Sequence, residues 1–204
     1  MLLASVQVIR ESLGFDDMAD INAAIETALH AAEPQLAAIL QTRFERAEVT
    51  DTFWVYEPGF RQGMHVQTEF KLSRGFLASA PTITATEAPS LFGTSASQEL
   101  TGVMKVDLEL GVATDWKSRF NNQYVEFSYT AGFEADEDSP ESYKLSQVPS
   151  WLQEAAKLKC LLHLAKNPSL TEVGIQLDQK TLEAQYAALI NPHLRYAPSA
   201  LLPM

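Results

Sequence analysis

Cysteine is nearly absent from this sequence. Cys160 is the only one in 204 residues, which excludes a disulfide within the chain and fits a protein made in a reducing cytoplasm. Leucines at 158, 161 and 162 surround it, and free cysteines in such a setting are commonly buried and unreactive. We therefore expect Cys160 to be a core residue and not a nucleophile.

Positive charge and long apolar runs are also scarce. Fifteen lysines and arginines stand against 26 acids, giving a net charge of −11, which argues against a reader of nucleic-acid sequence. No apolar run approaches the ~20 residues of a membrane-spanning helix. The opening stretch, "MLLASVQVIRESLG", lacks the basic leader of a signal peptide. We expect a soluble protein that is cytoplasmic when made.

Familiar catalytic and cofactor-binding motifs are missing. The sequence contains no G-x-S-x-G, H-E-x-x-H or C-x-x-C, no glycine-rich phosphate loop and no calcium-loop spacing. Its four histidines have no metal-ligand spacing and lie at positions 30, 65, 163 and 193. We therefore expect a protein that is not an enzyme, with no catalytic residue, no metal and no cofactor.

One acidic run keeps an enzymatic alternative open. Its five carboxylates, which could hold a cation or serve a metal-assisted hydrolase, are Glu134, Asp136, Glu137, Asp138 and Glu141. The run lacks the glycine that turns an EF-hand loop, and its proline and serines are typical of a solvated, mobile connection. We favour the solvated connection.

Helical periodicity marks the N-terminal part of the chain. Residues 3–13 predict a short helix that ends at Gly14. A longer helix follows to about residue 41, with Asp16 or Asp17 as its cap and a kink or break at Pro34.

A helical period returns near the other end. Pro149 opens a helix that ends at Asn167-Pro168, with Ser146 as a candidate cap. Its apolar stripe provides the predicted core anchors, which are Trp151, Leu158 and Leu162. A last helix is predicted over 178–190.

Between the helices, the hydrophobic period changes from 3.6 to 2. This alternation predicts strands within 49–57, 64–72, 81–87, 102–110 and 123–131. The clearest alternation, of Met104, Val106 and Leu108 with charged residues, is followed by Gly111 and a polar turn. We therefore expect the strands at 102–110 and 123–131 to form an antiparallel pair.

The order of elements predicts an α+β fold, in which the N- and C-terminal helices form a bundle and an antiparallel β-subdomain is inserted between them. The predicted parts are a bundle of 1–46 and 149–190, a β-subdomain of 47–133, an acidic connecting loop of 134–148 and a C-terminal docking tail of 191–204.

Two surfaces stand out as candidates for interaction. Between residues 11 and 41 there are six acids and no lysine or arginine, which predicts either a solvated face or a functional acidic wall. The candidate wall residues are Asp16, Asp17, Asp20, Glu26 and Glu33. The tail "NPHLRYAPSALLPM" has prolines that favour an extended backbone, and it either docks into another chain or folds back on its own bundle. Its candidate docking residues are Leu194, Arg195, Tyr196, Leu201, Leu202 and Met204.

Three stretches resemble the head–tail connector (adaptor) proteins of long-tailed bacteriophages. They are the N-terminal helices, the strands with "FKLSRGFLASAPTITAT" and "VMKVDLELGV", and "VEFSYTAGF" followed by "VPSWLQEAAKLKCLLHLAKNP". The last, a strand that leads to a proline-opened helix, is the most specific. The resemblance covers roughly residues 5–167. The acidic spacer between Gly132 and Pro149 is longer than the corresponding spacer in the connector pattern.

The resemblance implies a structural virion protein and not an enzyme. Such connectors form a ring, typically twelve-fold, beneath the portal of the filled capsid, and they extend the DNA channel and carry the neck or tail protein on the other side. The implied partners are therefore further copies of the chain, the portal protein, the tail-side neck protein and genomic DNA, which passes without sequence-specific binding; no membrane is involved. The implied location is the virion neck, after synthesis in the host cytoplasm. On this reading the acidic wall would line the channel and repel the DNA phosphates.

The nearest alternative is another neck component, either a stopper or a tail-completion protein. These are also rings without chemistry, but they contain more β-structure. The metal-assisted hydrolase that uses the 134–141 run is the remaining alternative.

Overall fold

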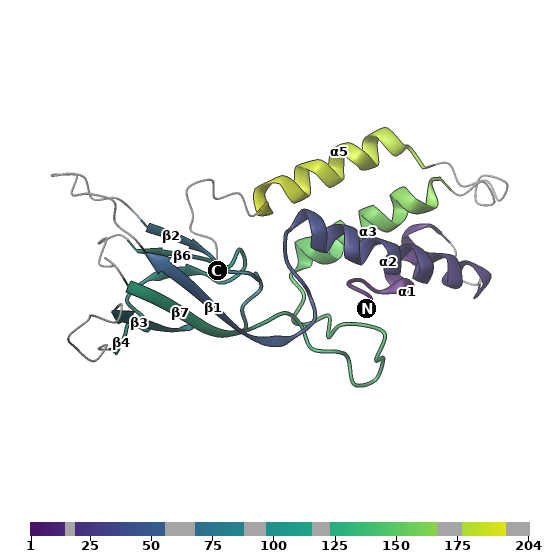
Figure 1. Ribbon diagram of the computed structural model, residues 1–204. Helices are drawn as coiled ribbons and strands as arrows, with labels where there is room; N and C mark the ends of the chain where they lie inside the picture. The colour runs from purple at the N-terminus through teal and green to yellow at the C-terminus, as the bar shows by residue number, and fades with distance from the viewer. Residues whose placement is uncertain (15–18, 56–67, 88–96, 116–122, 167–176, 195–204) are drawn as a thin grey trace. The chain divides into compact units, whose positions relative to one another are not determined.

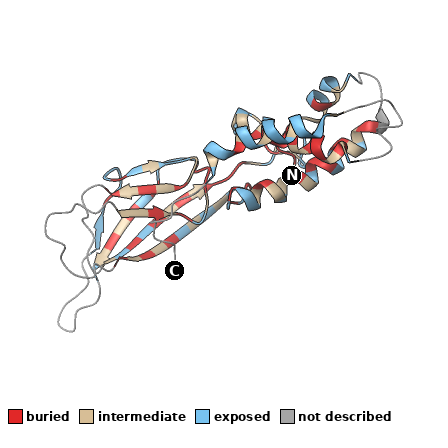
Figure 2. Ribbon diagram, turned by 90° about the horizontal axis from the view of Figure 1, so that it is seen from above, coloured by how far each residue is buried: buried red, intermediate tan, exposed pale blue. Residues whose placement is uncertain are grey.

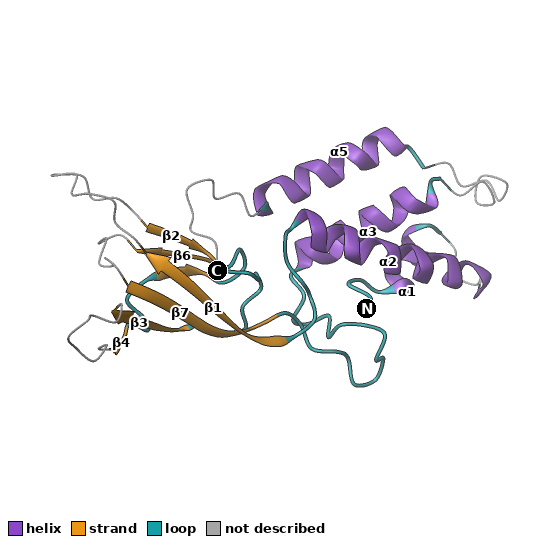
Figure 3. Ribbon diagram, in the orientation of Figure 1, coloured by secondary structure: helices purple, strands orange, loops and turns teal. Residues whose placement is uncertain are grey.

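The structure is a computed structural model that describes residues 1–14, 19–55, 68–87, 97–115, 123–166 and 177–194 (Figure 1). The helices are α1 (Val6–Ser12), α2 (Ala19–Ile39), α3 (Ser150–Leu164) and α5 (Gln179–Ile190), and the short 3-10 helix η1 (Asn191–His193) follows α5. The strands are β1 (Ala47–Val55), β2 (Thr68–Lys71), β3 (Thr82–Glu87), β4 (Ser97–Glu99), β5 (Lys105–Asp107), β6 (Val112–Asp115) and β7 (Gln123–Ala131). Helices and antiparallel sheets occupy separate stretches of the chain, so the predicted α+β class is confirmed (Figure 3).

The chain forms two compact units. The helical unit comprises Met1–Gln41 and Phe133–Leu194, and the β unit comprises Thr42–Gly132. Residues 134–148, which the sequence assigned to a connecting loop, lie in the helical unit.

The core of the helical unit is built from apolar stripes at helical spacing. Helix α3 contacts both α2 and α5, and α1 packs against α2. The buried side chains of α2 include Ile21, Ile25, Leu29, Ala32 and Leu36 (Figure 2). Cys160 of α3 is buried as predicted, and burial raises the pKa of its thiol to about 12. No helix in the described part of the chain is long and apolar enough to cross a membrane.

Gly14 and Pro34 act differently on the N-terminal helices. Helix α1 ends as predicted, because Gly14 takes a positive φ of 77° that a side chain would disfavour. The predicted break at Pro34 is absent, since α2 runs as one helix from Ala19 to Ile39. Pro34 is exposed, while Ala32 and Leu36 on either side are buried, so core packing holds the helix together around the missing hydrogen bond.

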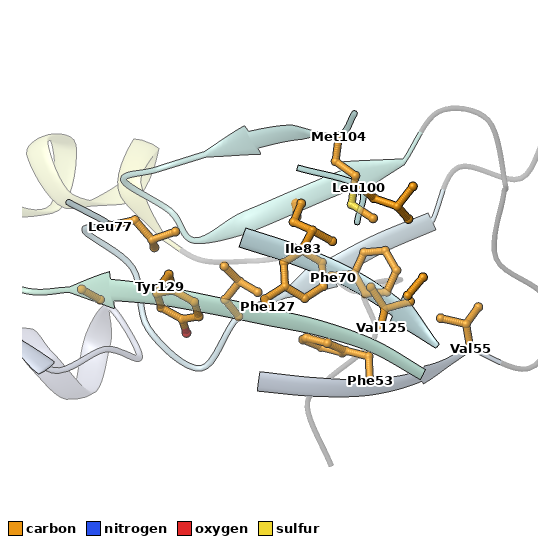
Figure 4. Close-up of a cluster of buried hydrophobic side chains, with 14 residues drawn as sticks. Phe53, Val55, Phe70, Leu77, Ile83, Leu100, Met104, Val125, Phe127 and Tyr129 are labelled. Atoms are coloured by element: carbon orange, nitrogen blue, oxygen red, sulfur yellow. The ribbon is translucent and has the colours of Figure 1, made fainter. Parts of the chain in front are cut away.

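Two antiparallel sheets make up the β unit. The four-stranded sheet has the order β1-β7-β3-β4, and the three-stranded sheet has the order β2-β6-β5. Both contribute to one apolar core, in which Phe53, Phe70 and Phe127 have ring centroids 5.2 to 5.4 Å apart (Figure 4). Two of these ring pairs meet edge to face, a favourable aromatic geometry.

The predicted pairing of the strands at 102–110 and 123–131 is wrong. Strand β7 pairs with β1 and β3 instead, and β5 pairs with β6. Strand β5 stops at Asp107, because the Asp107 carboxylate accepts the amides of Glu109 and Leu110 and closes a turn. Leu108 is therefore exposed, and the chain returns at once as β6.

A buried carboxylate on β1 fixes the segment that follows β2. Asp51 is 5% exposed, and its Oδ2 accepts both the Tyr129 hydroxyl and the Ser73 amide at 2.6 Å. The Tyr129 hydroxyl in turn accepts the Arg74 amide at 3.3 Å. Burial first, and the bond to Asp51 second, raise the pKa of Tyr129 to about 12. These bonds attach residues 73 and 74 to the four-stranded sheet.

Candidate interaction surfaces

The five residues of the predicted acidic wall have different surroundings. Asp16 and Asp17 lie outside the described residues, and Asp20 lies in the first turn of α2, where its side chain is not described. Glu26 is exposed on the second turn of α2. Glu33 is half-buried, and its carboxylate accepts the Tyr143 hydroxyl at 2.7 Å and pairs with the N-terminal ammonium. Glu33 therefore has a structural contact that Glu26 lacks.

The acidic loop at 134–148 makes backbone contacts within the helical unit, and Glu137, Asp138 and Glu141 are exposed on it. Its backbone folds back on itself between Ala135 and Tyr143, and Leu2 adds to it through bonds to Glu141 and Tyr143. The Tyr143 side chain is only 2% exposed, and its ring meets Phe133 edge to face. Buried Tyr143 and Val148 anchor the loop to the helical unit, which the acidic composition did not indicate.

The carboxylates of this loop serve local contacts. Glu134 Oε2 accepts the Gln147 side-chain amide at 2.8 Å and lies 3.8 Å from Lys144 Nζ. Asp136 Oδ1 accepts the Asp138 amide at 3.1 Å. Across the described ranges, no group of three or more His, Cys, Asp or Glu side chains is placed to hold a metal ion.

Helix α3 begins differently from the prediction. Pro149 is its N-cap, and no side chain, Ser146 included, caps it by a hydrogen bond. The Gln153 side-chain amide donates to the carbonyls of Leu145 and Val148 in the preceding turn, both at 2.9 Å. Further along α3, the His163 imidazole lies 3.1 Å from the Gln35 side-chain nitrogen. Partial burial, and then Lys159 and Lys166, lower the pKa of His163.

The three predicted core anchors on α3 are not equivalent. Leu158 and Leu162 are 6% and 8% exposed, whereas Trp151 is half-buried. The Trp151 ring stacks on the His193 ring in η1, with centroids 3.6 Å apart and an interplanar angle of 7°. Trp151 therefore joins α3 to the segment after α5, whereas its helical spacing predicted a core anchor.

We expect the Trp151–His193 stack to stabilise the end of the helical unit. A double-mutant cycle with Trp151→Ala and His193→Ala should give a coupling free energy of about 0.5 to 1.5 kcal/mol, as for other ring pairs. Trp151→Ala alone should cost about 2 kcal/mol, less than for a fully buried aromatic. Urea unfolding measures both values, and a coupling of zero would show that the stack contributes nothing.

The predicted docking tail lies mostly outside the described residues. Leu194, its first candidate residue, is 38% exposed at the end of η1. The candidates beyond the described part of the chain are Arg195, Tyr196, Leu201, Leu202 and Met204. Helix α5, which precedes the tail, is capped by the Asp178 carboxylate, and the Lys159 ammonium lies 5.1 Å from the centroid of the Tyr186 ring.

A third surface was not found from the sequence. Burial alternates along β1 from Asp51 to Val55, along β7 from Val125 to Ala131 and along β3 from Ile83 to Ala85, and the residues between the buried ones face away from the core. Strand register assigns two further residues of β4 to the same side. This outer sheet face comprises Glu48, Thr50, Thr52, Trp54, Thr82, Thr84, Thr86, Ser97, Glu99, Tyr124, Glu126, Ser128 and Thr130. The alternation in "VTDTFWV" and "TITATE" predicted strands, but only the observed order β1-β7-β3-β4 joins their outward faces into one surface.

Comparison with known proteins gives structural similarity only. No protein-family model matches the sequence, and no curated protein matches it. Among solved structures, a chain in "Virion of native gene transfer agent (GTA) particle" is similar at a TM-score of 0.46 and 15% identity, over 96% of this chain and 91% of that chain. A chain in "Neck of native GTA particle computed with C12 symmetry" has a TM-score of 0.43 and 12% identity, over 94% and 88%. A chain in "Neck of empty GTA particle computed with C6 symmetry" has a TM-score of 0.41 and 14% identity, over 81% and 80%.

Proposed function

We propose that this protein is a head–tail connector (adaptor) of a phage-like particle. In this proposal, copies of the chain form a ring under the portal, typically of twelve subunits, which extends the DNA channel and offers a platform to the neck or tail protein. The helical bundle with its inserted β-subdomain is the framework of the ring. The protein acts in the virion neck as a structural component and catalyses no reaction.

The observation that carries the proposal is the passage from β7 to α3, the stretch in which the resemblance to connectors is most specific. Strand β7 ends at Ala131, Gly132 follows with a φ of 89°, and Pro149 is the N-cap of α3. The extra length of the spacer is used in the helical unit, where Tyr143 is buried and binds Glu33. The one departure from the connector pattern thus has a structural role.

The contacts of the carboxylates in the acidic loop weigh against the alternative of a metal-assisted hydrolase. Glu134 is engaged by Gln147 and Lys144, and Asp136 accepts a backbone amide of its own loop. A cation would have to displace these bonds before it gained carboxylate ligands.

The acidic part of α2 is proposed to face the DNA channel. Glu26, whose side chain is exposed, belongs to this acidic wall. We assign Asp16, Asp17 and Asp20 to the same wall. Glu33 adds charge to the same helix but also holds Tyr143. A wall of one sign repels the phosphate backbone, so that DNA slides past without binding.

The tail is proposed to dock into the portal, with its leucines and tyrosine as anchors and Arg195 as a polar contact. Deletion of residues 195–204 tests this proposal. The deletion keeps His193, so the Trp151 stack and the fold should remain, and the melting temperature should be unchanged. Binding to DNA-filled, tail-less heads should be lost, and DNA should leak from them.

Each alternative outcome of the truncation is informative. A truncated protein that misfolds would place the tail in its own core. One that folds and still closes heads would contradict docking through the tail. Full-length protein, added to the same heads, is the control.

A further inference from the structure

The outer sheet face carries charge of one sign. None of the residues of β1, β3, β4 and β7 is a lysine, arginine or histidine. Glu48, Glu99 and Glu126 are exposed on this face, and among the described residues no salt bridge engages them. A polar face with only negative charges favours a cationic partner.

An aromatic pair lies near Glu126, the glutamate of the outer sheet face that is on strand β7. Trp54 and Tyr124 are directly opposite each other on β1 and β7, with ring centroids 4.5 Å apart and planes inclined by 48°. Tyr124 is 38% exposed. Glu126 is two residues further along β7, so its carboxylate is on the same face, about 7 Å away along the strand.

Hydroxyl groups flank this glutamate on both sides. Thr52 is opposite Glu126 on β1, and Thr84 is opposite it on β3. Glu99 follows on β4, opposite Thr84. One row across the sheet therefore alternates hydroxyl and carboxylate acceptors, and the next row begins with the two aromatic rings.

This combination suits a guanidinium better than an ammonium. A guanidinium is planar, so it can stack on an aromatic ring while it forms two parallel hydrogen bonds to a carboxylate. An ammonium can form the ion pair but has no flat face to stack. We propose that the outer sheet face is a docking site for another protein that presents an arginine, which stacks on Tyr124 and pairs with Glu126.

Two copies of this chain would not pair face to face here, because the strands of each copy present only negative charges on this face. The proposal concerns a surface of the β unit alone. It does not depend on a role as a connector, and it can be tested on the free protein.

The test uses the full chain, labelled with nitrogen-15, and two probes of equal charge, hexa-arginine and hexa-lysine. Amide signals of Tyr124 and Glu126, and the indole signal of Trp54, should shift and saturate with hexa-arginine. Hexa-lysine should bind about two- to fivefold more weakly, because it loses the stacking contribution. Glu126→Gln and Tyr124→Ala should each weaken hexa-arginine binding by a similar factor.

Two control variants separate specific docking from general attraction and from misfolding. Glu137→Gln removes one exposed charge from the helical unit and should leave the binding unchanged. Tyr124→Phe keeps the ring and should bind like the unmodified protein. Equal binding of the two peptides, or binding insensitive to Glu126→Gln, would overturn the proposal. A concentration-dependent dimer that Glu126→Gln abolishes would also overturn it, in favour of self-association.

Discussion

Replacing Gly132 by alanine is expected to destabilise the protein by more than about 3 kcal/mol. Gly132 has a φ of 89°, a conformation that costs an alanine about 1 kcal/mol or more. A Cβ at this position would also lie 2.4 Å from the Glu45 carbonyl oxygen and 2.6 Å from that of Phe44. Both contacts are with backbone, so a side-chain rotation cannot relieve them. Urea unfolding measures the loss.

Gly14 offers a matched control. Its φ of 77° is similar, but a Cβ there would meet no atom within 4 Å. Gly14→Ala should therefore cost only the conformational part, about 1 kcal/mol. Equal losses at the two glycines would show that the backbone around Gly132 moves aside easily, and that the end of β7 is not tightly held.

Replacing Asp51 by alanine is the second change with a large expected effect. The Tyr129 hydroxyl and the Ser73 amide would both lose their acceptor in a buried site, which should cost about 3 kcal/mol or more. Asp51→Asn keeps an oxygen of the same shape and should cost clearly less. Equal losses for the two variants would mean that the charge of Asp51, and not its hydrogen bonds, stabilises the β unit.

The same network predicts a dependence on alkaline pH. The folded-state pKa of Tyr129 is about 12, above its ordinary value of 10.0, so the unfolded chain releases the phenolic proton first. The contribution of this group to stability should be complete below pH 10.0 and decline as the pH rises towards about 12. Tyr129→Phe should remove this part of the decline, and an unchanged pH profile in the variant would contradict the assignment.

The sequence predicted those parts of the fold in which hydrophobic residues keep one period, either helical or alternating, over many residues. Most of the long α2 and α3 stripes is buried, and so is one face of β7 from Val125 to Ala131 and of β1 from Asp51 to Val55. Strand β4 has three exposed residues and hence no alternation to recognise. The alternation around Val106 predicted too long a strand. The Asp107 carboxylate accepts the Leu110 amide and closes a turn, so the strand ends at Asp107 although the hydrophobic alternation continues to Leu110.

The candidate surfaces were less predictable, because they depend on contacts between distant residues. Glu33 and Tyr143 are 110 residues apart, and nothing local indicates that one accepts a bond from the other. Trp151 has the spacing of a core residue, yet it stacks on His193. The outer sheet face appears only when β1, β7 and β3 are placed side by side.

Imaging of the portal vertex tests the proposed connector function most directly. Purified protein would be added to DNA-filled, tail-less heads of the particle it serves, and the vertex would be reconstructed by electron cryomicroscopy. We expect a ring of this chain directly beneath the portal, with the helical unit around the DNA path and residues 195–204 in contact with portal subunits. Heads that carry no added density at the portal, or that bind the protein at another surface, would contradict it.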